Sequence, residues 1–222
     1  MLLEIACFNT ESCLIAQRAG AHRIEFCEDH SSGGITPTRE NILQVRKMIQ
    51  IPLHVIIRPR SGNFIYNNLE LQQMKQDILF CRENLIDGVV LGILNDKYEV
   101  EVAAAQELLS LCGTMSKTFH RAIDECADLF QATEKLIPLG FHRILTSGGN
   151  GKAIDHIPTL TELQLKFSHR IKIMPGGGVR SSNLASLKAT KCDEFHSAAI
   201  TNNGQIPDEK EIRELLHVLK DF

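Results

Sequence analysis

Residues 4–12 read EIACFNTES, and this stretch decides between the two folds that the rest of the chain allows. A short apolar strand that runs into a helix opens both a doubly wound open sheet and a closed (β/α)8 barrel. The dinucleotide-binding form of the open sheet carries the pattern G-x-G-x-x-G directly after its first strand. Residues 4–12 contain no glycine, so the sequence argues against that fold and predicts no nucleotide cofactor.

Short apolar runs alternate with longer segments of 3.6-residue periodicity along the whole chain. The apolar runs predict strands at Leu2–Ala6, Arg23–Phe26, Leu53–Ile57, Gly88–Leu91, Lys117–His120, Arg143–Thr146, Ile171–Met174 and Glu194–His196. Helices are expected between them, for example at Leu69–Asn84, Val100–Leu111 and Glu209–Leu219. Eight β-then-α units without a linker predict an α/β protein, a compact single-domain (β/α)8 TIM barrel over residues 1–222.

Two hexapeptides, AGAHRI at 19–24 and LGFHRI at 139–144, form a weak internal repeat. Each places a glycine where a helix is expected to end and a strand to begin. Strand runs such as HVII and GVVL are continuously apolar, which predicts a parallel sheet covered on both faces.

The composition excludes several classes of protein. A net charge of −3 and a pI near 6.3 give no sign of nucleic-acid binding. No run of about 18 apolar residues predicts a membrane span. The N-terminus has an acid at Glu4 and no basic segment, so we expect no signal peptide. Seven cysteines without any C-x-x-C pair predict a reduced, cytoplasmic protein rather than a disulfide scaffold.

In a (β/α)8 barrel the chemistry lies at the C-terminal ends of the strands, and polar residues collect there in this sequence. Glu4, Glu25 and His120 are the candidates for acid–base catalysis. The candidates for substrate or anion binding are Arg58, Arg60, Arg121, Ser147, Gly148, Gly176, Gly177, Gly178, His196 and Ser197. The alternative is a purely structural salt-bridge layer, in which Glu4 and Glu25 pair with Arg58 and Arg121.

Two of these stretches predict an anion site. MPGGGV at 174–179 places three glycines after a strand, where bare backbone N–H groups can hold phosphate. The alternative is that these glycines only permit a tight turn. In RPR at 58–60, we expect Arg58 to pair partly with Glu4 and Glu25, and Pro59 to direct Arg60 over the mouth of the barrel.

The chain resembles the copper homeostasis protein CutC family. The resemblance rests on RIEFC (23–27), GGITP (33–37), IIRPRSGNF (56–64), DGVVLG (87–92), TFHRAID (118–124), RILTSG (143–148), MPGGGV (174–179) and EFHSAA (194–199). It implies a (β/α)8 barrel, a cytoplasmic protein and a role in copper handling. The strand-two cysteine of the family corresponds to Cys27, its strand-five His-Arg pair to His120 and Arg121, and its strand-three arginines to Arg58 and Arg60.

The chain departs from the family pattern in two places. Ala6 stands where the family has its strand-one cysteine, and Cys7 follows one residue later. Because side chains alternate along a strand, we expect the Cys7 thiol to face away from Cys27. Asn63 replaces an acidic residue of the family pattern.

Three functions therefore stay open. Cu(I) prefers soft thiolate ligands, so Cys27 is the candidate ligand, with Cys7 a weaker one and His120 or His196 as a second donor. The alternative is an enzyme with acid–base chemistry on a small phosphorylated or carboxylated substrate and no copper role. The third is a binding module without turnover. The expected partner is a small molecule or a metal, with neither nucleic acid nor membrane, and the sequence leaves a homo-oligomer open.

Overall fold

The computed structural model describes residues 1–201 and 204–220. The predicted domain, 1–222, also includes positions 202, 203, 221 and 222, which lie outside the described residues. The strands are β1 (Leu2–Cys7), β2 (Arg23–Phe26), β3 (Leu53–Ile56), β4 (Gly88–Leu91), β5 (Ser116–Phe119), β6 (Arg143–Thr146), β7 (Lys172–Pro175) and β8 (Glu194–Ser197). Every strand agrees with its predicted range to within one residue at each end.

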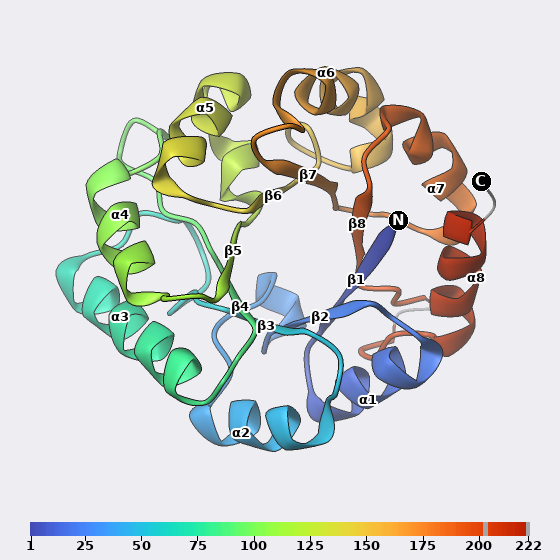
Figure 1. The fold of residues 1–222 in the computed structure, drawn as a ribbon, viewed down its shortest axis with the longest axis horizontal. Coiled ribbons are helices and arrows are strands. Elements are labelled where there is room, and N and C mark those ends of the chain that lie inside the picture. Colours follow the sequence, from blue (N-terminus) through green and yellow to red (C-terminus); the bar gives the residue numbers. More distant parts are fainter. Residues whose placement is uncertain (202–203, 221–222) are drawn as a thin grey trace.

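The strands form one parallel sheet in the order β7-β6-β5-β4-β3-β2-β1-β8. β7 and β8 also lie side by side, so the sheet curves round into a nearly closed barrel. Figure 1 looks along this barrel, with the strands in the centre and the helices around them. The predicted (β/α)8 barrel is therefore confirmed, and the doubly wound open sheet is excluded.

A helix follows each strand and packs on the outside of the barrel (Figure 1). The helices are α1 (Thr10–Ala19), α2 (Arg39–Met48), α3 (Asn68–Glu83), α4 (Val102–Leu111), α5 (Leu129–Leu139), α6 (Ile157–Phe167), α7 (Ser181–Leu187) and α8 (Glu209–Lys220). None of the helices in the described ranges is long and apolar enough to cross a membrane.

The two repeated hexapeptides form equivalent junctions. Gly20 ends α1 and Gly140 ends α5, with φ of 97° and 87°, the left-handed conformation that glycine adopts without steric penalty. Each junction continues into a strand whose first residue is an arginine, Arg23 in β2 and Arg143 in β6. Both arginines are buried inside the barrel.

The two faces of the sheet differ in polarity. The outward face carries apolar side chains such as Leu3, Ile5 and Phe26, which pack against the helices in the main core. The inward face carries mostly charged and polar side chains: Glu4, Arg23, Glu25, His54, Thr118, His120, Arg143, Glu194 and His196. The predicted covering of both faces is correct, but the inner face is covered largely by ion pairs rather than by apolar packing.

Candidate functional site

A cavity of about 220 Å³ opens at the C-terminal ends of the strands. An engineered cavity of about 150 Å³ is large enough to hold benzene, so this space fits a small organic molecule. Its walls combine apolar, charged and backbone groups from every part of the chain. The lining residues are Ala6, Phe8, Glu25, Cys27, Gly33, Ile56, Arg58, Phe64, His120, Arg121, Leu145, Gly177, Gly178, Arg180, His196, Ser197 and Ala198.

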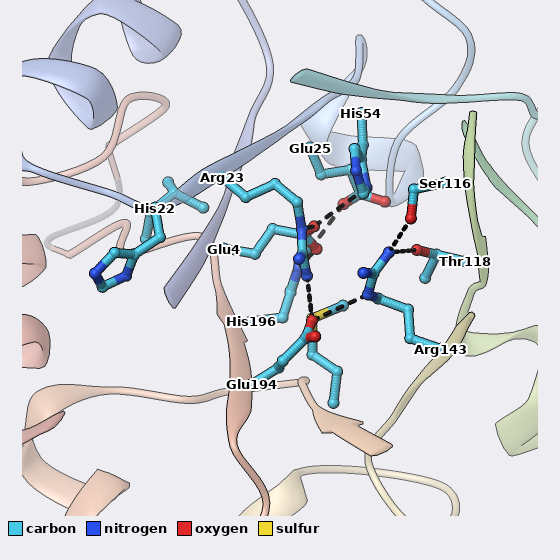
Figure 2. A network of polar contacts seen from close by, with 12 residues as sticks. Glu4, His22, Arg23, Glu25, His54, Ser116, Thr118, Arg143, Glu194 and His196 are labelled. Carbon is cyan, nitrogen blue, oxygen red and sulfur yellow. Dashed lines mark hydrogen bonds and ion pairs between the residues drawn. The ribbon is translucent and has the colours of Figure 1, made fainter. Parts of the chain in front are cut away.

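A network of buried ion pairs fills the barrel below this cavity (Figure 2). Arg23 donates to Glu4 and, at 2.6 Å, to Glu194. Arg143 donates to the same Glu194 carboxylate at 3.0 Å and to the hydroxyls of two residues on β5. Two carboxylates thus meet two guanidiniums. We call Glu4, Arg23, Arg143 and Glu194 the ion layer.

The strand register explains why Glu4 contacts both of its neighbours. On β1, Glu4 is paired in register with Arg23 of β2 on one side and with His196 of β8 on the other. Burial by itself would raise the pKa of Glu4, but Arg23 and the hydrogen bond with His196 hold it well below its usual range. Glu4 is fully buried and does not line the cavity, so the predicted direct catalytic role for Glu4 is not supported.

His196 connects the ion layer to the cavity. Its Nδ1 lies 2.8 Å from a Glu4 carboxylate oxygen, and its Nε2 lies 3.6 Å from a carboxylate oxygen of Glu25 (Figure 2). Burial would lower the pKa of His196, but its hydrogen bond with Glu4 and the charge of Glu25 raise it above the ordinary value.

Glu25 is the acidic side chain of the cavity wall. Burial, reinforced by the charge of Glu4, raises its pKa to about 7, even though His196 acts in the opposite direction. A carboxyl group with a pKa near neutrality exchanges protons readily at physiological pH. The sequence prediction of Glu25 as an acid–base candidate therefore coincides with a buried, titratable group in the cavity.

His120 stands at the end of β5 and is buried. Its Nδ1 accepts a hydrogen bond of 3.2 Å from the backbone N–H of Ala122, which leaves the proton on Nε2 in the neutral ring. That Nε2 is buried and has no hydrogen-bond partner in the described part of the chain. Burial, with a smaller contribution from Arg58, lowers the pKa of His120 to about 3, so the ring is neutral.

Arg58 does not make the predicted pairs with Glu4 and Glu25. Its guanidinium instead donates to the backbone carbonyls of Ser32, Gly34 and Gly62, at 2.8–3.0 Å, and lies 4.8 Å from the ring centre of Phe64. The extended loop after β3 carries Arg58 past the ion layer, where Arg23 already neutralises Glu4. Arg58 is therefore a buried cation in the cavity wall with no carboxylate partner among the described residues.

The sequence predicted that Arg60 lies over the mouth of the barrel, and this prediction is wrong. Its Nε donates to Glu70 at 2.5 Å, and its two Nη atoms donate to the loop carbonyls of Ser61, Asn63 and Ile65. Glu70 lies in the first turn of α3, where the side chain also caps the helix. Arg60 thus fastens the β3–α3 loop to this helix and does not line the cavity.

The glycine loop after β7 divides into two parts. Gly176 is buried, and a Cβ there would lie 2.4 Å from Leu145, so this glycine is required by packing. Gly177 and Gly178 line the cavity, and neither backbone N–H has a hydrogen-bond partner in the described chain. Packing therefore explains Gly176. Gly177 and Gly178, with φ of 91° and 75°, adopt the left-handed conformation of a turn, and they also leave donors at the mouth.

Ser147 and Gly148 lie behind the wall rather than in it. Asp124 accepts hydrogen bonds from both the backbone N–H and the hydroxyl of Ser147, and it also pairs with Arg121 at 2.9 Å. A Cβ at Gly148 would lie 2.9 Å from His156. The predicted anion-binding roles of Ser147 and Gly148 therefore reduce to holding Arg121 and the loop in place.

Cys27 is the cysteine of the cavity wall, and Cys7 faces the opposite way into the main core, as predicted. Burial, followed by the charge of Glu25, raises the pKa of the Cys27 thiol well above its ordinary value. No group of three or more His, Cys, Asp or Glu side chains in residues 1–201 and 204–220 is arranged to hold a metal ion.

The cavity gathers nine of the predicted residues: Glu25, Cys27, Arg58, His120, Arg121, Gly177, Gly178, His196 and Ser197. The sequence did not point to Arg180 or to the aromatic rings of Phe8 and Phe64, which also line it. Arg180 directly follows the glycine loop, and its Nη1 donates to Ser197 at 3.2 Å. Its position next to MPGGGV was the signal in the sequence that could have revealed it.

These features define a (β/α)8-barrel protein with a polar, ligand-sized cavity at the C-terminal ends of its strands. The chain belongs to the CutC family, whose sequence pattern matches residues 1–201. A family protein CutC from Xanthomonas campestris pv. campestris (strain 8004) is 42% identical over 200 residues, which cover 90% of this chain and 83% of that protein.

Solved structures agree with this assignment. A Streptococcus agalactiae protein provisionally named copper homeostasis protein CutC has a TM-score of 0.86 and 34% identity, covering 90% of this chain and 100% of that one. A phosphoribosylanthranilate isomerase from Thermotoga maritima has a TM-score of 0.66 at 12% identity, with 100% of each chain covered. The second likeness concerns the barrel fold alone.

Proposed function

We propose that the protein is an enzyme that performs acid–base chemistry on a small anionic molecule bound in the mouth cavity. The observation that supports this most is Glu25, a buried carboxyl in the cavity wall with a pKa of about 7. His196 lies 3.6 Å from it and is itself held by Glu4. Strongly perturbed titratable groups that share a cavity are typical of active sites.

The charge of the cavity wall supports an anionic substrate. Three guanidiniums line the cavity, those of Arg58, Arg121 and Arg180, against the single carboxyl of Glu25. Asp124 pairs with Arg121, but the other two have no carboxylate within 4.0 Å in the described chain. The bare N–H groups of Gly177 and Gly178 add donors on the same side. A phosphate or carboxylate group would satisfy these charges and donors.

Turnover of a mixture of small phosphorylated and carboxylated metabolites tests this function. The wild-type protein is expected to consume at least one anionic compound, measured by mass spectrometry, and the Glu25→Gln variant is expected to consume none. Gln has the shape of Glu but carries no titratable proton. A wild-type protein that changes no compound in the mixture would contradict the proposal.

Copper handling is the second candidate. It is supported by the name of the Streptococcus agalactiae relative and by the position of Cys27 in the cavity wall. Titration with Cu(I) under reducing conditions should then reveal one site that Cys27→Ser weakens at least about tenfold, roughly 1.4 kcal/mol. Cys7→Ser should have a smaller effect, since that thiol faces the main core. If neither variant changes the affinity, copper does not bind at the mouth.

We also place the protein in the cytoplasm. All seven cysteines are free thiols, and six of them are buried. Proteins of oxidising compartments use such residues in disulfides, whereas a reducing compartment keeps them as thiols. Fractionation of the source cells with a compartment marker would test this location.

A further inference from the structure

The Nε2 atom of His120 has no hydrogen-bond partner in the described chain, and acid–base chemistry at Glu25 gives it no role. Buried donors nearly always have a partner, so a buried Nε2–H without one points to a ligand atom that is its partner. Ala122 fixes the tautomer, because its N–H points at Nδ1 and leaves the proton on Nε2. His120 therefore adds to the cavity wall a neutral side-chain hydrogen-bond donor in a fixed tautomer.

The His120 ring is held rigidly in position. The Phe64 ring centre lies 4.8 Å from the imidazole centre on one side. On another side, a Cβ at Gly92 would lie 2.5 Å from the Cε1 and Nδ1 atoms, so only glycine leaves room for the ring. A donor that cannot turn away is suited to an atom on which charge develops during a reaction.

His120 and Glu25 reach the cavity from different walls. Glu25 lies on β2 and His120 follows β5, with β3 and β4 between them in the sheet. A small molecule in the cavity can therefore present one atom to the carboxylate and another to the imidazole.

We propose that the substrate carries a carbonyl group next to an acidic C–H bond, in addition to its anionic group, and that the reaction begins by removing that proton. This inference rests on the proposed function and names the chemistry of the same site. Glu25 is the base and His120 is the hydrogen-bond donor to the carbonyl oxygen. The pairing of a carboxylate base with a neutral imidazole donor is a known solution for enolisation in barrel enzymes.

The step balances without any other reactant. The Glu25 carboxylate takes the proton from the carbon next to the carbonyl group, and the C–H electron pair forms a C=C bond. The carbonyl π electrons move to oxygen, where the Nε2–H of His120 donates to the developing charge. The carboxylic acid of Glu25 then returns the proton to the same carbon, whose new C–H bond takes the C=C electron pair while the C=O bond re-forms. The product is the substrate with an exchanged proton or, where that carbon is a stereocentre, its epimer.

Exchange of solvent deuterium tests this inference. The protein is incubated in D2O with pyruvate or dihydroxyacetone phosphate, which both combine an anionic group, a carbonyl and an adjacent C–H bond. Loss of the C–H signal is followed by proton NMR. We expect the wild-type protein to accelerate exchange in at least one of the two, and Glu25→Gln to remove at least about 100-fold of that acceleration.

Two substitutions of His120 separate its donor from its structural role. The short amide of His120→Asn reaches the Nδ1 position and still accepts from Ala122, but it places no donor at the Nε2 position. The longer amide of His120→Gln reaches the Nε2 position and still donates. We expect exchange to fall about 100-fold in His120→Asn, the typical effect of removing one such donor, and to be largely retained in His120→Gln.

The exposed His169 gives a matched control, and His169→Gln should exchange like the wild type. Equal exchange in wild type and His120→Asn would remove His120 from the reaction. Calorimetric binding of pyruvate or dihydroxyacetone phosphate without any exchange would overturn the enolisation inference but leave the proposed anion site intact. Neither binding nor exchange, together with no turnover in the metabolite mixture, would overturn both.

Discussion

The barrel contains two polar regions that lie one above the other and differ in how completely they are satisfied. In the ion layer, Arg23 and Arg143 meet Glu4 and Glu194, and none of these four residues has a fully buried side-chain nitrogen or oxygen without a hydrogen-bond partner in the described chain. Beside the layer, the buried Nδ1 of His54 lies 3.8 Å from Glu4 and has no such partner. In the cavity above it, the buried Nε atom of Arg58 and the Nε2 atom of His120 have no partner in the described chain. The charged groups of the ion layer are therefore paired with one another, whereas the cavity wall keeps, among the described residues, a cation without a carboxylate partner and an imidazole donor without an acceptor.

The difference teaches where stability ends and function begins. A buried ion pair stabilises little compared with apolar packing, but removing one of its partners is strongly unfavourable. A buried donor without a partner weakens the fold by about 1–3 kcal/mol, and a bound ligand that accepts its hydrogen bond removes this cost. We infer that the ion layer serves the fold and that the cavity is completed by its ligand.

The largest effect should come from breaking the ion layer. Arg23→Met leaves Glu4 and Glu194 buried with fewer cationic partners, so the free energy of unfolding should fall by about 3–5 kcal/mol. Urea denaturation measures this change. Arg18→Met is the matched control, because Arg18 is an exposed arginine on the adjoining helix, and its effect should be far smaller. Similar losses in the two variants would mean that the layer does not hold the fold.

The next largest effect should be the loss of stability at acidic pH that the buried His120 of the cavity causes. The pKa of His120 is about 3 in the folded protein and 6.5 ordinarily. Between these two pH values the imidazole is protonated in the unfolded chain but neutral in the folded protein. Between these values the wild type should lose up to about 1.4 kcal/mol of stability for each unit that pH falls. His120→Asn does not titrate, so its stability should fall less steeply between pH 6.5 and 4.5. Parallel urea-denaturation curves for the two proteins would show that His120 is charged when folded.

Glu25 should make the stability depend on pH in the opposite direction to His120 and by a smaller amount. Its pKa is about 7 when folded and 4.5 ordinarily, so the folded protein binds the proton more tightly than the unfolded chain. As pH rises between these values, the wild type should lose up to about 1.4 kcal/mol per unit relative to Glu25→Gln. The pH range over which Glu25 affects stability is narrower than the range for His120, because the folded and unfolded pKa values of Glu25 lie closer together. Thermal unfolding at pH 5, 6 and 7 measures it, and a constant difference between the proteins would refute it.

The smallest effect should be that of Arg60. Its guanidinium is occupied by Glu70 and loop carbonyls, so Arg60→Met should change the affinity for pyruvate or inorganic phosphate by less than about twofold, or 0.4 kcal/mol. Arg58→Met should weaken the same binding at least about tenfold. Isothermal calorimetry compares the two arginines of one loop directly. A larger loss from Arg60→Met than from Arg58→Met would reverse our assignment of the two side chains.

The positions of the strands and of two helix ends could be predicted from the sequence, because local sequence patterns determine them. The apolar runs located all eight strands to within one residue at each end, and Gly20 and Gly140 marked two helix ends. Period-two alternation also separated Cys7 from Cys27 correctly. Each of these features depends on residues that are close together in the sequence.

The partners of the long charged side chains could not be predicted from the sequence. Arg23 and Arg58 have the same charge, and only the register across β1 and β2 places Arg23, rather than Arg58 of the loop after β3, beside Glu4. Arg60 turned to Glu70 because that carboxylate starts the next helix and lies closer than the mouth. Such choices depend on depth along the barrel axis, which no local pattern in the sequence records.

The repeated junction ties two distant parts of the barrel to one residue. AGAHRI and LGFHRI end equivalent helices with glycine, and in each copy the histidine accepts a hydrogen bond from the backbone N–H at the start of the neighbouring strand. Each copy then sends its arginine to one shared carboxylate, Glu194, from opposite halves of the barrel. The two junctions lead into β2 and β6, four βα units apart in the barrel. One carboxylate near the barrel axis therefore fixes two distant helix-to-strand junctions at once, so a substitution of Glu194 would release both.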